Sequence, residues 1–257
     1  MKKVLPLLVA LISCDSKPAP TPVVPGPGPV PMVATTFGAV SGIVVVKGDD
    51  VAPVTKKIAG QEAHCGAGPV DLGVWRVDAA TRGLCDAHVW IEVAGVRPEW
   101  PAGRPAPSLD NGKCVFKPPV VMMAPGDLRI SNSDTIPHSA NLDAKTNASE
   151  NVMLPTGASR LLSLRIPERI EVTCSVHPWM HAVVIVMKTP WEALSGEGGR
   201  FEMARVPVGR HRVKVWHRCV GEVDGGEVEV VENGRGEVRI EVAPIVGFRA
   251  RFGAPGK

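Results

Sequence analysis

From Phe37 onward the chain is a succession of short runs in which apolar and polar residues alternate, and Gly, Pro, Asn or Asp separate the runs. A period of two residues is typical of a strand buried on one face, and the helical period of 3.6 residues is almost absent. The sequence therefore predicts an all-β fold of short strands joined by tight turns.

The first block of strands is interrupted by a long aperiodic stretch. GAVSGIVVVKG at 38–48 is a candidate strand pair, and AHVWIEVAG at 87–95 is a further strand. Residues 49–83 between them show no period, which predicts a long excursion. The proline-rich segment 98–112 then marks a boundary.

A denser block of strands follows this boundary. Leu128 and Ile130 share one face of a strand, ASRLLSLRIPERIEVTC at 158–174 supplies two strands, and the apolar run at 182–188 is typical of a central strand. These runs predict a small antiparallel sandwich at 109–188. A third block begins at 198–217, and after it Asn233 and Gly234 predict a hairpin turn.

The loop CSVHPWM, residues 174–180, carries the candidate chemistry. Blue copper sites use two imidazoles and one thiolate close to a plane, with a weak axial thioether. The loop offers Cys174, His177 and Met180, and SDTIPHSAN places a second imidazole, His138, after a strand and a proline. The sequence therefore predicts that these four side chains hold one copper ion.

Each of these residues alone has an ordinary structural explanation. A single cysteine or methionine is usually part of the core, and His138 alone would be a loop histidine. Order, spacing and strand context together favour copper. Zinc fits less well, because structural zinc favours more thiolates and catalytic zinc seldom uses a thioether.

The pair PHSA and CSVHPWM resembles the ligand loops of the small blue copper proteins, the cupredoxins, over about 109–188. The two-residue gaps on both sides of His177 resemble the amicyanin-like loop. This resemblance implies a Greek-key sandwich with one type 1 copper ion, in which His138, Cys174 and His177 are equatorial ligands and Met180 is axial.

The same resemblance implies a docking surface. In such loops the second histidine, here His177, reaches solvent through an apolar collar, to which Pro178 and Trp179 would contribute. A redox protein is expected to dock there. Ser139 departs from the family pattern, which usually has asparagine directly after the first histidine.

The outer blocks resemble the two halves of a carboxypeptidase regulatory-like sandwich. GAVSGIVVV and AHVWIEV resemble the first half, and GRFEMARVPVGRHRVKVWH resembles the second. Each half alone would expose a sheet edge. We therefore expect 37–108 and 189–246 to fold as one β-sandwich with the copper domain, 109–188, inserted, and 247–257 to be a tail.

The N-terminus predicts export and lipidation. MKKVLPLLVALISC combines two lysines with an apolar run too short to span a bilayer. Its last four residues resemble a bacterial lipoprotein box, which implies a signal peptide at 1–13 and lipid on Cys14. A proline-rich tether at 14–36 follows. These features place the protein in the cell envelope, anchored to a membrane on the periplasmic side.

Six cysteines in an exported chain require an explanation, because the compartment is oxidising. One is assigned to lipid and one to the metal, and the remaining four allow three connectivities. If the outer halves join, Cys85 pairs with Cys219. Cys65 then pairs with Cys114 and ties the excursion to the copper domain.

Charge excludes one class of partner. Removal of Lys2 and Lys3 takes the 29 basic residues to 27 against 26 acidic residues, so the mature chain is close to neutral. No basic patch is visible, and no nucleic-acid partner is expected.

Taken together, the sequence predicts a lipid-anchored one-electron carrier rather than an enzyme. A site with these four ligands has no open equatorial position for substrate. The other histidines show no recognisable cluster; they are His64, His88, His181, His211 and His217. The alternatives are a copper storage or delivery protein, and a binding or structural β-sandwich lipoprotein whose copper site has decayed.

Overall fold

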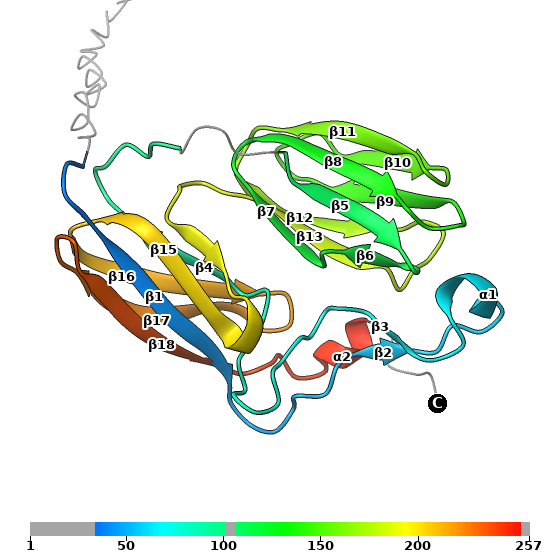
Figure 1. The fold of residues 1–257 in the computed structure, drawn as a ribbon, viewed down its shortest axis with the longest axis horizontal. Coiled ribbons are helices and arrows are strands. Elements are labelled where there is room, and N and C mark those ends of the chain that lie inside the picture. The colour runs from blue at the N-terminus through cyan, green and yellow to red at the C-terminus, as the bar shows by residue number, and fades with distance from the viewer. Residues whose placement is uncertain (1–33, 101–105, 253–257) are drawn as a thin grey trace, which may run out of the picture. The chain divides into compact units, whose positions relative to one another are not determined.

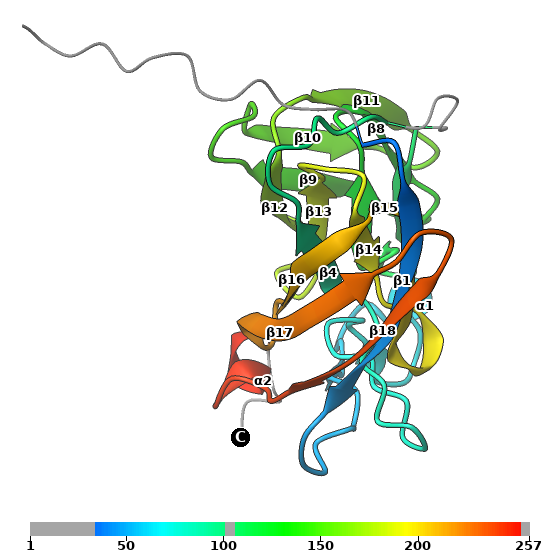
Figure 2. The same ribbon diagram turned by 90° about the vertical axis from the view of Figure 1, so that its left-hand side faces the viewer.

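The computed structural model describes residues 34–100 and 106–252, and strands dominate these residues (Figures 1 and 2). The prediction of an all-β fold is confirmed. The signal peptide at 1–13, Cys14 and most of the tether lie outside the described residues. Among the described residues, no helix has the length and apolar character needed to cross a membrane.

The central sandwich, formed by β5 to β13, packs two sheets face to face. Their strand orders are β10-β9-β12-β13-β7 and β11-β8-β5-β6. The pairs β5–β8 and β7–β13 are parallel, so the prediction of a purely antiparallel sandwich was wrong. The strands are β5 (Ser108–Gly112), β6 (Val115–Lys117), β7 (Val120–Met123), β8 (Gly126–Asn132), β9 (His138–Asp143), β10 (Glu150–Leu154), β11 (Ser159–Leu164), β12 (Glu168–Thr173) and β13 (His181–Val186).

Alternation along these strands builds the core of the central sandwich. Leu128 and Ile130 of β8 are fully buried, and Ile170 and Val172 of β12 face them from the other sheet. Cys174 continues the inward-facing positions of β12 into the following loop, because every second residue of a strand points to the same face. The core therefore positions this thiol at one end of the sandwich.

A second sandwich, here called the split sandwich, is formed by β1, β4 and β14 to β18. Each of its two sheets combines a strand that precedes the central sandwich in the chain with strands that follow it. Their orders are β15-β1-β18 and β14-β4-β16-β17. Thus β1 lies between β15 and β18 (Figure 1). In the other sheet, β4 lies between β14 and β16. The strands are β1 (Phe37–Val46), β4 (His88–Glu92), β14 (Glu192–Leu194), β15 (Arg200–Pro207), β16 (Gly209–His217), β17 (Gly221–Val230) and β18 (Arg235–Val242), with a short 3₁₀ helix at Glu197–Gly199.

Two local predictions for the split sandwich were wrong. Residues 38–48 supply one long strand, β1, rather than a pair. The turn at Asn233 exists, with φ of 54°, but it does not close a hairpin. Strand β17 stays with β16, while β18 crosses to the other sheet and pairs with β1 in parallel. The Asn-Gly sequence specified that the chain reverses after β17. The free edge of β1 then determined the strand with which β18 pairs.

The excursion and the C-terminal segment contain small elements of their own. The excursion holds β2 (Thr55–Lys56), α1 (Glu62–Cys65) and β3 (Val70–Asp71). The tail predicted at 247–257 carries helix α2 (Phe248–Arg251), whose Phe248 is buried in the core of the split sandwich.

The cysteines follow the predicted pairing in one case only. Cys65 and Cys114 form a disulfide with an S–S distance of 2.03 Å. The predicted pair of Cys85 and Cys219 was wrong, because both are buried and neither forms a disulfide in the described part of the chain. The β4–β16 ladder would place them opposite one another, but it ends at His88, and the chain turns away at Asp86, whose φ is 61°.

Strand β12, which leads to Cys174, also contacts the split sandwich. The Arg169 guanidinium lies 5.5 Å and 4.8 Å from the ring centroids of Trp90 and Trp216. Arg218 forms an ion pair of 3.1 Å with Glu171. The strand that carries the thiol is therefore supported from outside its own sandwich.

Glu168 at the start of β12 predicts an acid-sensitive stability. Partial burial raises the pKa of its carboxyl, but hydrogen bonds from the backbone N–H groups of Asn147 and Lys145 and from the side-chain amide of Asn147 outweigh this and lower the pKa from 4.5 to about 2. A carboxyl whose pKa is lowered by folding stabilises the protein at pH values above its pKa in the unfolded state. This stabilisation is lost as the pH falls towards the pKa in the folded state. We expect Glu168→Gln to lower the urea midpoint at neutral pH. The loss of wild-type stability between about pH 5 and pH 2 should be smaller in this variant, and an unchanged acid profile would contradict this.

Candidate metal centre

The four residues predicted as ligands come from two neighbouring strand ends of one sheet. His138 is the first residue of β9. Strands β12 and β13 pair with Thr173 opposite His181, so residues 174–180 form the loop that joins them. Since β9 pairs with β12, this loop and His138 lie at the same end of the sandwich.

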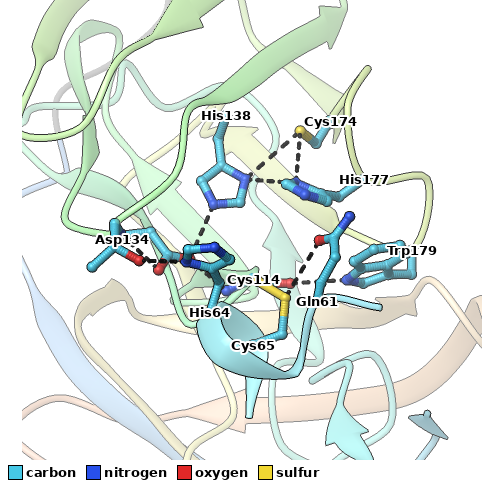
Figure 3. The surroundings of a disulfide bond; sticks show 10 residues. Gln61, His64, Cys65, Cys114, Asp134, His138, Cys174, His177 and Trp179 are labelled. Carbon is cyan, nitrogen blue, oxygen red and sulfur yellow. Dashed lines mark hydrogen bonds and ion pairs between the residues drawn. A yellow bond between two sulfur atoms is a disulfide. The ribbon is translucent and has the colours of Figure 1, made fainter. Parts of the chain in front are cut away.

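Three donor atoms converge in a buried space (Figure 3). The Cys174 Sγ atom lies 4.0 Å from His138 Nδ1 and 3.9 Å from His177 Nδ1. The two Nδ1 atoms are 2.9 Å apart. All three side chains are buried, with exposed fractions of 3%, 0% and 1% for Cys174, His138 and His177.

These separations fit a small trigonal metal site. For metal–N and metal–S distances of about 2.0 and 2.3 Å, ligands around a trigonal centre would be about 3.5 to 3.7 Å apart. The observed separations of 2.9 to 4.0 Å bracket those values. Two imidazoles and one thiol suit a borderline or soft transition metal, and the lack of a carboxylate among the three disfavours calcium and magnesium.

Met180, the predicted axial ligand, is buried in the core beside the thiol. Its side chain is 1% exposed and belongs to the same core cluster as Cys174. Its backbone N–H donates to the carbonyl of His177 at 3.0 Å, which closes the turn between the two residues.

The thiol lies in an environment that favours its ionised form. Burial raises the pKa of Cys174, but hydrogen bonds from His138 and from the backbone N–H of Ser139 outweigh it and lower the pKa to about 7. Burial lowers the pKa of His138, while hydrogen bonds to Cys174 and Asp134 raise it more strongly. The thiolate is the form that ligates metals, so the site is prepared for a cation at neutral pH.

Asp134 holds His138 from the side opposite the thiol. Its Oδ2 accepts from His138 Nε2 at 3.0 Å, so this nitrogen is occupied and Nδ1 is left to face Cys174. Burial raises the pKa of Asp134, but hydrogen bonds from Cys114 N–H and His138 lower it overall. A carboxylate that orients a histidine in this way is typical of the outer shell of a metal site.

Ser139 forms hydrogen bonds that link the two ligand segments, although the family pattern usually has asparagine at this position. Its backbone N–H donates to Cys174 Sγ at 3.3 Å. Its hydroxyl oxygen accepts from the backbone N–H of Ser175 at 2.8 Å. The departure from the cupredoxin pattern therefore does not remove the link between the segments.

We expect Ser139→Ala to lower the free energy of unfolding of the metal-free protein by about 1–3 kcal/mol, because the Ser175 N–H loses its acceptor. Urea unfolding measures this effect. Ser163→Ala is the matched control, because Ser163 is exposed on β11, and it should change the value by less than about 0.5 kcal/mol. Equal effects of the two substitutions would exclude a special role for Ser139.

His177 does not reach solvent, which corrects the expectation of an exposed ligand edge. Burial and the neighbouring His138 lower the pKa of its imidazole. The Trp179 ring lies 5.0 Å from the His177 ring and is half-buried, whereas Pro178 is exposed. Trp179 packs against the cores of both sandwiches and against the disulfide of Cys65 and Cys114. The sequence did not predict that Trp179 would contact all three.

Sequence reasoning missed Asp134. A signal for Asp134 was present, because a carboxylate four residues before His138 in the same loop can reach the imidazole. His64, for which the sequence showed no cluster of histidines, forms a hydrogen bond of 3.0 Å between its Nδ1 and the hydroxyl of Thr135, and among the described residues it belongs to no group of converging donors.

No protein-family model matches the sequence, and no curated protein is similar enough to match it. Among solved structures, a purple cupredoxin from Nitrosopumilus maritimus is 20% identical, with 31% of this chain and 98% of that chain covered and a TM-score of 0.28. An amicyanin variant is 17% identical, with 38% and 98% covered and a TM-score of 0.30. A copper-containing nitrite reductase from Thermus scotoductus SA-01 is 18% identical, with 36% and 25% covered and a TM-score of 0.31. This chain therefore spans a quarter of the length of that reductase.

Proposed function

We propose that the protein is a type 1 copper protein that carries one electron at a time. The observation that carries this proposal is the convergence of one thiol and two imidazole Nδ1 atoms in a buried space. Cys174, His138 and His177 would be the equatorial ligands and Met180 the axial one. Bound copper would supply a one-electron couple, and the chain's own groups would set its conditions.

The arrangement favours electron transfer over catalysis. Residues held by packing on both sides change position little, and a buried site excludes water and substrates. His138 is fixed by Asp134, and the Cys174 sulfur accepts from Ser139 N–H, so the donor atoms keep one arrangement. We therefore propose a carrier rather than an enzyme.

The remaining parts of the proposal concern location and partner. The lipoprotein-like segment ending at Cys14 would anchor the protein to a membrane on the periplasmic side. A redox protein would dock on the loop beside the metal centre, where Pro178 is exposed and Trp179 half-exposed. Because His177 is buried, the electron would pass between the metal and the partner through the residues of this loop, rather than directly through a solvent-exposed imidazole.

Voltammetry of the protein loaded with one equivalent of copper tests the proposal. A carrier should show a reversible one-electron couple and should retain copper against a moderate chelator, because the ligands are buried. A copper delivery protein would instead release its metal to that chelator. A loaded protein without a reversible couple would contradict the electron-carrier function.

A further inference from the structure

Resting on the proposed function, we infer that Cys114 is a positioning residue for both imidazole ligands, and that its disulfide with Cys65 fixes it in this role. Cys114 belongs to the turn between β5 and β6, and its sulfur lies near Asp134 and His138 but is bonded to Cys65 and is therefore not available as a thiolate ligand. Its peptide groups reach the outer partners of His138 and of His177. The disulfide would thereby couple the excursion of the split sandwich to the metal centre.

The first connection leads to His138. The Cys114 backbone N–H donates to Asp134 Oδ2 at 2.8 Å. The same Oδ2 atom accepts from His138 Nε2 at 3.0 Å. A displacement of the turn would therefore move the carboxylate oxygen that orients this imidazole.

The second connection leads to His177. The Cys114 carbonyl accepts from Trp179 Nε1 at 3.1 Å. The Trp179 ring covers the His177 ring at a centroid distance of 5.0 Å. The same residue thus fixes, through its N–H and its C=O, the groups that contact each of the two imidazoles (Figure 3).

The turn that contains Cys114 has an unfavourable sequence for its conformation. Gly112 pairs with Val115, so Lys113 and Cys114 are the two turn residues, and their φ angles are 55° and 59°. Positive φ at both central positions favours Asn and Gly, and other residues adopt it at a cost. Interactions from outside the turn must maintain this conformation.

The excursion supplies that support. Cys65 at the end of α1 is bonded to Cys114. Ile58 and Cys65 pack with Cys114 against Ile136 and Trp179. These contacts hold the excursion on the loops that carry the metal ligands, and the disulfide is the covalent part of that attachment.

The experiment compares the full chain with the double variant Cys65→Ser and Cys114→Ser. The control is the double variant Cys85→Ser and Cys219→Ser, which removes two buried thiols of the split sandwich. Two quantities are measured: the affinity for Cu(II) by chelator competition, and the alkylation rate of Cys174 by iodoacetamide in the metal-free protein, followed by peptide mapping. We expect the first variant to lose about tenfold or more in affinity and to be alkylated faster at Cys174, whereas the control matches wild type.

Wild-type affinity and wild-type alkylation in the first variant would overturn the inference and leave the disulfide with a purely structural role. If that variant does not fold, Trp179→Phe replaces it, because it keeps a ring over His177 and removes the N–H that Cys114 accepts. It should shift the reduction potential of the loaded protein, and an unchanged potential would also overturn the inference. Failure of the wild type to bind copper would instead refute the proposed function, while the metal-free alkylation rates still test the positioning of Cys174 and its neighbours.

Discussion

Cys174→Ser should abolish the intense visible absorption that Cu(II) produces when it binds a thiolate, and should weaken copper binding by at least two orders of magnitude. Serine retains the size of the side chain but not the soft donor that suits copper. The thiol lies 3.9 to 4.0 Å from both imidazole Nδ1 atoms, and among the described residues no other thiol converges on both imidazoles. Absorption spectroscopy during a Cu(II) titration measures both effects.

The matched control is Cys85→Ser, which changes a buried, unpaired cysteine in the split sandwich. It should leave the absorption band and the affinity at their wild-type values. A band that survives Cys174→Ser, or disappears in the control, would assign the chromophore to a different thiol.

Asp134→Ala should have the second largest effect. The substitution leaves His138 Nε2 buried without its acceptor and removes the acceptor of the Cys114 N–H. Loss of such an outer-shell partner typically costs about 10- to 100-fold in metal affinity. These polar groups, left without a hydrogen-bond acceptor, should also lower the free energy of unfolding by about 1–3 kcal/mol.

Chelator competition and urea unfolding measure these two effects of Asp134→Ala. Asp127→Ala is a suitable control, because Asp127 forms an exposed ion pair with Arg165 and lies outside the metal centre. It should leave the metal affinity unchanged and alter the free energy of unfolding by no more than about 1 kcal/mol. Equal affinities for Asp134→Ala and wild type would contradict the role of the carboxylate in orienting His138.

The sequence predicted the local periodicity well because burial on one face imposes it directly. Alternation at Leu128 and Ile130, and at Ile170 and Val172, corresponds to the core of the central sandwich. The order and spacing of Cys174 and His177 predicted that they would meet His138, since two strand ends of one sheet can bring a loop and a distant residue together.

The rest depended on tertiary pairing, which local patterns do not specify. Asn233 marked a turn, but only the open edge of β1 determined that β18 would leave its neighbour. The turn at Asp86 separates Cys85 from Cys219, which would lie opposite one another only if the β4–β16 ladder continued past His88. The covering of His177 likewise results from Trp179 packing against a segment about a hundred residues earlier in the chain.

A Cu(II) titration of the wild-type protein, followed by visible absorption and electron paramagnetic resonance, tests the metal centre most directly. One equivalent of Cu(II) should produce an intense charge-transfer band and the narrow copper hyperfine splitting typical of a thiolate-bound type 1 site. A colourless protein, or one that binds Cu(II) with the wide splitting of nitrogen and oxygen ligands, would contradict the proposal that His138, Cys174 and His177 hold copper together.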